Sequence, residues 1–179
     1  MFRDQENPET GDDIGMVTIG GDAEPVWLLH EPYHERNAEL SPDGRWMAYQ
    51  SDESGRWEIY VRPFPHVDDD LWPVSNAGGV KPLWSRDGRE LFYLEPGPPT
   101  RLISVSIEAT ETVFSSGLRT PLLDWPYRGL QGAGRTYDVS DDGQRFLAIE
   151  EGGAEGTTAR IIVVQNWFEE LRRLAPPVE

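Results

Sequence analysis

The stretch Ala38–Tyr49, with the sequence AELSPDGRWMAY, decides the fold of this chain. At its centre, Ser41–Gly44 predicts a tight turn. The proline ring presets φ, the aspartate can accept a hydrogen bond from the local backbone, and the glycine accepts positive φ. Leu40 precedes the turn, and the apolar run 46–49 that follows it is typical of a buried strand. The stretch therefore predicts a strand, a turn and a second strand.

The same pattern occurs twice more, in Leu83–Tyr93 (LWSRDGRELFY) and in Asp138–Ala148 (DVSDDGQRFLA). The serines of the three Ser-x-Asp-Gly turns lie 44 and 55 residues apart along the chain. The prolines that open three short strands are 48 residues apart each time: Pro25, Pro73 and Pro121. A four-strand repeat of this length is the sequence signature of a β-propeller blade.

We therefore expect an all-β fold, a partial β-propeller of about three four-stranded blades with a short C-terminal helix. When the strands of a blade are lettered a to d from the axis outward, the sequence predicts thirteen strands in the order c d, a b c d, a b c d, a b c. The leading strands c and d are Asp13–Ile19 and Pro25–Leu29. The longer third interval predicts an insertion between Glu108 and Gly134, in a loop on one face.

The chain divides into three segments on this reading. Residues 1–12 are polar and acidic and predict an N-terminal tail, and residues 13–165 hold the blades. Residues 166–179 predict a short helix followed by a tail. Asn166 suits the N-cap of this helix, Glu169 occupies the capping-box position, and the prolines at 176–177 end it.

Composition excludes several classes of protein. The 179 residues carry a net charge of −16, so a phosphate backbone would be repelled, and we expect no nucleic-acid partner. There is no cysteine for a disulfide or a thiolate metal site, and no run of about 20 apolar residues for a membrane span. No signal peptide is visible. We expect a cytoplasmic protein if the chain is full length, with a periplasmic location possible if it is a fragment.

The repeats resemble the TolB-type propeller, also called PD40 or WD40-like. Its motif is an apolar residue, then Ser-Pro-Asp-Gly, then a strand. Ser41–Gly44 matches the turn in full, and the turns at 85–88 and 140–143 depart only at the proline position. The portion Ile161–Leu174 is similar to the C-terminal end of propellers appended to bacterial serine/threonine protein kinases. Such propellers usually have six or seven blades, more than this chain encodes, and no kinase catalytic motif occurs in it.

Two motifs could suggest a metal site. His30–His34 matches the letters His-Glu-x-x-His of zinc peptidases, which place both histidines on one face of a helix. Pro32 disfavours a helix there, so we predict a polar surface loop. Asp68–Asp70 offers carboxylates, but no shaped calcium loop surrounds it, so a solvated connection is predicted. We predict that Asp12 and Asp13 are solvated in the same way. Ser115–Gly117 does not form a nucleophile elbow. We expect no metal, no cofactor and no catalytic residue.

The resulting expectation is a non-catalytic module that binds a protein or peptide through loops at the propeller mouth. Because an open array of blades leaves apolar faces exposed, we also expect a homodimer that closes the ring, the leading strand d of each copy completing the last blade of the other. The alternative is the accessory propeller of a kinase or peptidase whose catalytic domain lies on another chain or was lost.

Overall fold

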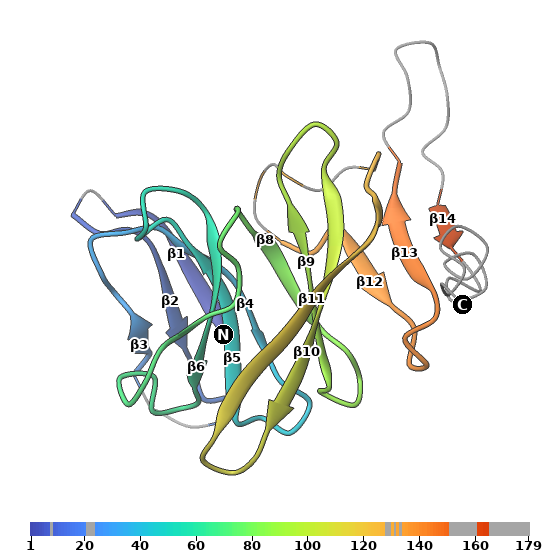
Figure 1. Cartoon of the computed structure of the whole chain (residues 1–179). Helices are drawn as coiled ribbons and strands as arrows, with labels where there is room; N and C mark the ends of the chain where they lie inside the picture. Colours follow the sequence, from blue (N-terminus) through green and yellow to red (C-terminus); the bar gives the residue numbers. More distant parts are fainter. Residues whose placement is uncertain are drawn as a thin grey trace.

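The chain forms a fan of four antiparallel sheets, which follow one another in sequence order (Figure 1). The computed structural model describes residues 1–7, 9–20, 24–127, 130, 132, 134–150 and 161–164. Within these residues there are fourteen strands and no helix. The fold is therefore all-β, a partial propeller, as the sequence predicts.

The second and third sheets are complete four-stranded blades, and in each the chain runs through the strands in order. The second sheet consists of β4 (Glu35–Leu40), β5 (Trp46–Ser51), β6 (Glu58–Pro63) and β7 (Trp72–Pro73). The third sheet consists of β8 (Val80–Trp84), β9 (Glu90–Glu95), β10 (Arg101–Ala109) and β11 (Phe114–Asp124). The predicted blades with strands a to d are confirmed. Part of the predicted insertion is not a loop, because it lengthens β11.

The first sheet corrects the prediction for the N-terminus. It contains β1 (Phe2–Asn7), β2 (Gly11–Met16) and β3 (Val26–Leu29), so residues predicted as a tail form a strand, and strand c begins and ends earlier than expected. The pairing of β1 with β2 joins Phe2 to Gly15 and Asp4 to Asp13. A backbone ladder needs no apolar alternation, and the polar sequence of β1 offers none. The sheet supplies strands b, c and d.

The last sheet has the predicted three strands a, b and c: β12 (Tyr137–Val139), β13 (Phe146–Ile149) and β14 (Ile161–Val164). The predicted helix at 166–174 lies outside the described residues. Within the described part, no helix is long and apolar enough to cross a bilayer.

All three Ser-x-Asp-Gly turns have one geometry. The glycines have φ values of 71°, 70° and 68° at Gly44, Gly88 and Gly143, as the turn prediction requires. In each turn the serine hydroxyl donates to the aspartate Oδ1 over 2.5–2.7 Å and accepts a hydrogen bond from the first amide of the next hairpin arm over 2.9–3.0 Å. The recurring aspartate is thus a structural residue.

Apolar side chains fill the space between neighbouring sheets. The cluster between the second and third sheets contains Trp46, Trp84 and Phe114, and a second cluster, with Phe92 and Phe146, joins the third sheet to the last. Met47 and Tyr49 face the first sheet. Each sheet is therefore held through its neighbours, as in other repeat architectures.

The strands a of the two complete sheets share an unusual bulge. Asn37 and Lys81 each lie four residues before the serine of their turn, and both have positive φ, at 54° and 58°. The buried Lys81 ammonium donates to the carbonyl oxygens of Gly132 and Gly134 over 2.9 and 2.8 Å. Asn37 accepts a hydrogen bond from the Gly134 amide over 2.8 Å. The connection between β11 and β12 is thereby fastened to both inner strands.

Candidate functional site

A large concave surface lies between the first two Ser-x-Asp-Gly turns. Its volume is about 730 Å³. One side is formed by the turn at 41–43, the opposite side by the turn at 87–89, and residues 106–109 at the end of β10 close it. We call this surface the turn groove. It lies at the end of the blades opposite to the loop that contains His30–His34.

Two buried tryptophans form the floor of the turn groove. The Trp84 indole Nε1 donates to the Glu39 carbonyl oxygen over 3.1 Å, which fixes the ring. Trp46 packs edge-on against Trp72, with ring centroids 5.4 Å apart, and against Phe114 at 5.3 Å. Contacts within the protein therefore hold both rings in place. Because tryptophan is buried on average, the sequence predicts that Trp27, Trp46, Trp57, Trp72 and Trp84 pack between blades. Trp46 and Trp84 do so, whereas Trp27 is 43% exposed.

The walls of the turn groove carry more acidic than basic groups. Asp43, Asp87 and Glu108 line it together with a single basic residue, Arg89. The hydrogen bond from the Ser85 hydroxyl, and then that from the Arg89 amide, hold the pKa of Asp87 below its ordinary value. The groove is therefore suited to a cationic group.

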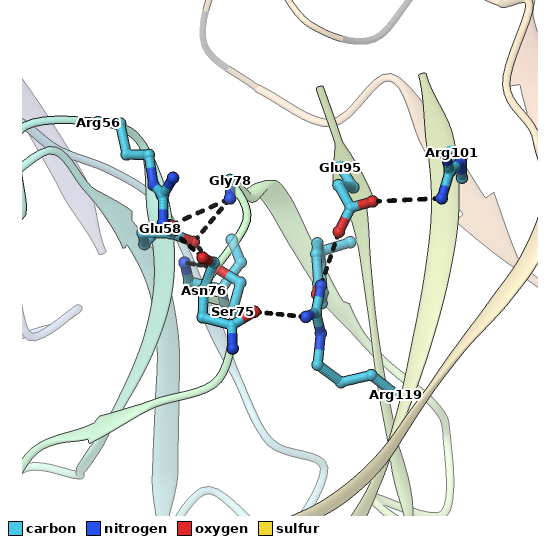
Figure 2. Close-up of polar contacts among 10 residues, drawn as sticks. Arg56, Glu58, Ser75, Asn76, Gly78, Glu95, Arg101 and Arg119 are labelled. Carbon is cyan, nitrogen blue, oxygen red and sulfur yellow. Dashed lines mark hydrogen bonds and ion pairs between the residues drawn. The ribbon is translucent and has the colours of Figure 1, made fainter. Parts of the chain in front are cut away.

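A different polar cluster joins the second and third sheets at the other end of their strands (Figure 2). The buried Glu58 carboxylate accepts hydrogen bonds from the Ser75 hydroxyl and from the Gly78 amide, the latter over 3.0 and 3.1 Å, and pairs with Arg56 Nε at 2.5 Å. Arg119, from β11, contacts the same loop through the Asn76 side chain at 2.6 Å. Because the described partners satisfy these groups, the cluster stabilises the junction of the two sheets.

Arg119 also completes a second pair in the same cluster. Its Nη2 lies 2.7 Å from Glu95 Oε2, and its Nε donates to the Tyr93 hydroxyl over 2.7 Å. Figure 2 shows Glu95 between Arg119 and Arg101, whose Nη1 is 3.8 Å from the other carboxylate oxygen. The arrangement connects the outer strand of the third sheet with the loop that follows β7.

The equivalent junction between the first and second sheets contains the predicted histidine motif. Residues 30–34 form a bend, not a helix, as the sequence predicts. His30 Nδ1 lies 2.9 Å from Asp13 Oδ2, and His34 Nδ1 lies 3.1 Å from Asp12 Oδ2, so the two histidines contact different carboxylates. Within the described residues no group of three or more His, Asp or Glu side chains is arranged to hold a metal ion.

Two features of this junction were missed from the sequence. Asp12 and Asp13, predicted as solvated, are almost fully buried on β2. Glu35, at the start of β4, is 2% exposed, and burial, together with the charge of Asp13, raises the pKa of its carboxyl group to about 8. Strongly shifted groups cluster at functional sites, but Glu35 does not line the turn groove. Neither β2 (GDDIGM) nor β4 (ERNAEL) has an apolar alternation that would have indicated this burial.

The Asp68–Asp70 segment lies in the connection between β6 and β7, where all three residues are exposed. The Asp70 carboxylate accepts a hydrogen bond from the Leu71 amide over 2.8 Å, and the Asp69 amide donates to the His66 carbonyl oxygen over 3.2 Å. These contacts are those of a surface connection.

The architecture defines a propeller of the TolB type. TolB from Acinetobacter baumannii aligns over 89% of this chain and 48% of its own, with a TM-score of 0.51 and 14% identity. A structure assigned as TolB from Agrobacterium tumefaciens aligns over 87% of this chain and 53% of its own, with a TM-score of 0.60 and 14% identity. At this identity the likeness shows the fold. The chain spans about half the length of these TolB chains.

Sequence relatives match shorter segments. A hydroxymethylglutaryl-CoA synthase from Methanothermobacter thermautotrophicus is 42% identical over 64 residues, which are 35% of this chain and 18% of the relative. Dipeptidyl aminopeptidase BI from Pseudoxanthomonas mexicana is 39% identical over 79 residues, which are 43% of this chain and 11% of the relative. No family model matches the chain. The similarity to kinase-appended propellers is not shown by these comparisons and stays a prediction.

Proposed function

We propose that this partial propeller is a non-catalytic module that binds a protein or peptide segment in the turn groove. The observation that carries the proposal is the groove itself, a concavity of about 730 Å³ with an aromatic floor and carboxylates on its walls. Preformed concave surfaces of this size, with a few polar groups around an apolar floor, are typical of binding sites. Loops and turns on a rigid repeat scaffold are also where such proteins bind their partners.

Selection from a random peptide library displayed on phage tests this proposal. The full chain is used as bait, next to Ala109→Trp, which fills the groove with an indole. The matched control is Ser54→Trp, at an exposed position in the connection between β5 and β6. We expect enriched peptides to bind the wild-type chain and the control, and to lose at least tenfold in affinity for Ala109→Trp. Failure to enrich any peptide, or equal binding by both variants, would contradict the proposal.

We also propose that a second copy of the chain covers the outer face of the last sheet. Phe146 and Ala148 point into the core, whereas Leu147 and Ile149, on the other face of β13, are 42% and 45% exposed. In a propeller the next blade packs on this face. The chain spans about half of the TolB chains that share its fold, which supports two copies per ring.

The observed first sheet changes the expected closure. Strand d was expected to complete the last blade of the partner, but β1 and β2 would then both be surplus. In the proposed assembly the three-stranded first sheet of each copy packs face to face on the last sheet of the other, a contact that closes with two-fold symmetry.

Light scattering at micromolar concentration measures the assembly. We expect a dimer for the wild-type chain and a folded monomer for the double variant Leu147→Glu and Ile149→Glu, because both side chains are exposed within one copy. Leu118→Glu, at a 76% exposed position on β11, is the control and should stay dimeric. A well-folded wild-type monomer would overturn the closed ring.

The second candidate function, the accessory propeller of a peptidase, rests on the match to dipeptidyl aminopeptidase BI over 79 residues. The genomic sequence on both sides of this chain tests it. A peptidase domain encoded in the same reading frame or the adjacent gene would support the accessory role, and unrelated neighbours would favour a free-standing binding module.

A further inference from the structure

At the end of strand β10, the backbone groups of Ala109 have no hydrogen bond among the described residues, and Ala109 lines the turn groove. The pairing of β10 with β9 ends at Ser106, which is opposite Glu90, although β10 continues to Ala109. The Ile107 amide donates to the Arg89 carbonyl oxygen over 2.7 Å, which shows that the backbone groups of residue 107 point toward the β9 side.

The direction of the Ala109 backbone follows from the hairpin to β11. The Thr110 amide donates to the Val113 carbonyl oxygen over 2.9 Å, so these two residues form a hydrogen-bonded pair. Hydrogen-bonded and non-hydrogen-bonded pairs alternate in an antiparallel ladder, so the next pair, Ala109 with Phe114, is of the second kind. The amide and carbonyl groups of Ala109 therefore point away from β11, into the turn groove that Ala109 lines.

The charges around the turn groove indicate which kind of peptide segment could pair with Ala109. Glu108 is exposed next to it, and no ion pair of Glu108 or Asp87 occurs among the described residues. Arg45 is partly neutralised already, because its Nε lies 3.3 Å from Asp43 Oδ2 and its Nη1 lies 3.9 Å from Glu111. Arg89, the basic residue that lines the groove, already interacts with Asp87, and three carboxylates line the groove against this one guanidinium. An entering cation would therefore meet a net negative charge, and an entering acidic side chain would be repelled.

We propose that the turn groove binds an extended basic peptide segment as an additional strand at the end of β10. This inference rests on the proposed binding function and specifies its ligand. The peptide backbone pairs with Ala109, and Arg or Lys side chains at alternate positions face Glu108 and Asp87. Backbone pairing gives such a complex its register, and the alternate side chains give it selectivity.

Fluorescence anisotropy with two labelled peptides tests the proposal on the full chain. The probe is a capped seven-residue peptide of alternating valine and arginine, and its counterpart carries glutamate in place of arginine. We expect the arginine peptide to bind at least tenfold more tightly, with a difference that decreases at high salt. Glu108→Gln should reduce the difference. Equal binding of the two peptides would overturn the inference.

The variant Ala109→Pro tests the strand addition, because proline removes the amide that points into the groove without removing a bond to β11. We expect at least a tenfold loss for Ala109→Pro and less than a twofold change for the control Ala109→Ser. If the proline variant does not fold, hydrogen exchange of the Ala109 amide in the wild-type chain gives the same information, because bound peptide should protect it. Unchanged exchange, or unchanged affinity of a folded Ala109→Pro, would contradict strand addition.

The outcomes separate this inference from the proposed function. Some library peptides could require an open groove and yet bind equally well to Ala109→Pro, or show no preference for positive charge. Either result would support the binding function and refute the basic added strand. Absence of any groove-dependent peptide in the library selection would refute the binding function itself.

Discussion

Glu35 shows how one side chain makes the stability of the fold depend on pH. Its carboxyl group is buried where the first and second sheets meet, and the carboxylates of Asp13, Glu31, Glu53 and Asp52 add to the effect of burial. All of these contributions favour the protonated form, so the pKa rises from 4.5 to about 8. At neutral pH the side chain is mainly an uncharged acid.

The expected pH dependence follows from this shift. The folded state binds the Glu35 proton more tightly than the unfolded state, so its contribution is fully present below about pH 4.5 and is lost as the pH rises through about 8. Glu35→Gln keeps a neutral side chain at every pH. We expect the variant to unfold with a free energy on the order of 1–3 kcal/mol higher than wild type at pH 8–9, and with a flatter pH profile.

Urea unfolding between pH 5 and 9 measures this difference. Glu111→Gln, at an exposed position in the hairpin between β10 and β11, serves as the control, because Glu111 does not contribute to the Glu35 shift, and it should follow the wild-type profile closely. Parallel profiles for wild type and Glu35→Gln would show that the Glu35 carboxyl group titrates at an ordinary pKa.

A second residue-level prediction concerns the left-handed turn position. A Cβ added to Gly44 would meet no atom within 4 Å, so the cost of a side chain there comes from the backbone angle of +71° alone. We expect Gly44→Val to lower the free energy of unfolding by about 1–3 kcal/mol, because a β-branched residue resists positive φ. Gly44→Asn should lose much less, because asparagine tolerates this region. Equal melting temperatures for the two variants would contradict the argument.

At the scale of the elements, the strands that the sequence predicts correctly are those with an apolar pattern or a turn next to them. β5, β9 and β13 follow the recurring turns directly, and their apolar runs decide their positions. β1 has neither signal, because its six residues are FRDQEN. It becomes a strand by pairing with β2 in a hairpin, and no apolar pattern of its own indicates this pairing.

The buried polar groups also lack a local sequence pattern that would predict their burial. Asp12 and Asp13 look like a solvated acidic pair in the sequence, but they are buried on β2, where side chains such as His30, His34 and Arg36 contact them. The turn groove was not predicted as a particular site for a similar reason. Its walls come from two different repeats, so the sequence could indicate loops as a binding surface but could not indicate which turns would meet.

The junction in Figure 2 gives a prediction for the interface of two elements. Glu58 receives its hydrogen bonds from the loop after β7, so loss of its charge should weaken the contact of the second sheet with the third. We expect Glu58→Gln to lower the free energy of unfolding by about 2–4 kcal/mol, since the Gly78 amide and Arg56 lose a charged acceptor. The exposed control Asp68→Asn should change it by less than about 0.5 kcal/mol. Thermal unfolding of both variants measures the difference, and equal melting temperatures would contradict the assigned role.

For the whole molecule, the repeat spacing predicted the class of fold, because three equal turns at blade-length intervals can belong to few architectures. The repeat spacing could not predict how many strands the first sheet has. That number matters for assembly, because a three-stranded first sheet can pack on a neighbour as a unit, whereas a lone strand d could only complete another blade. The proposed packing of the first sheet on a second copy therefore depends on β1, a strand that the repeat pattern does not predict.

The hydrogen bonds of Lys81 have a consequence for how cooperatively the chain unfolds. In repeat proteins each unit contacts only its neighbours, so units can open one at a time. Here the Lys81 ammonium and the Asn37 side chain both hold the segment that leads into β12, so opening of the last sheet also breaks contacts of the second and third. Native-state hydrogen exchange should therefore show one common opening free energy for slow amides in β5, β9 and β13. In Lys81→Met we expect β13 to exchange at a lower free energy than the other two, and separate values already in the wild-type chain would show that its blades unfold independently.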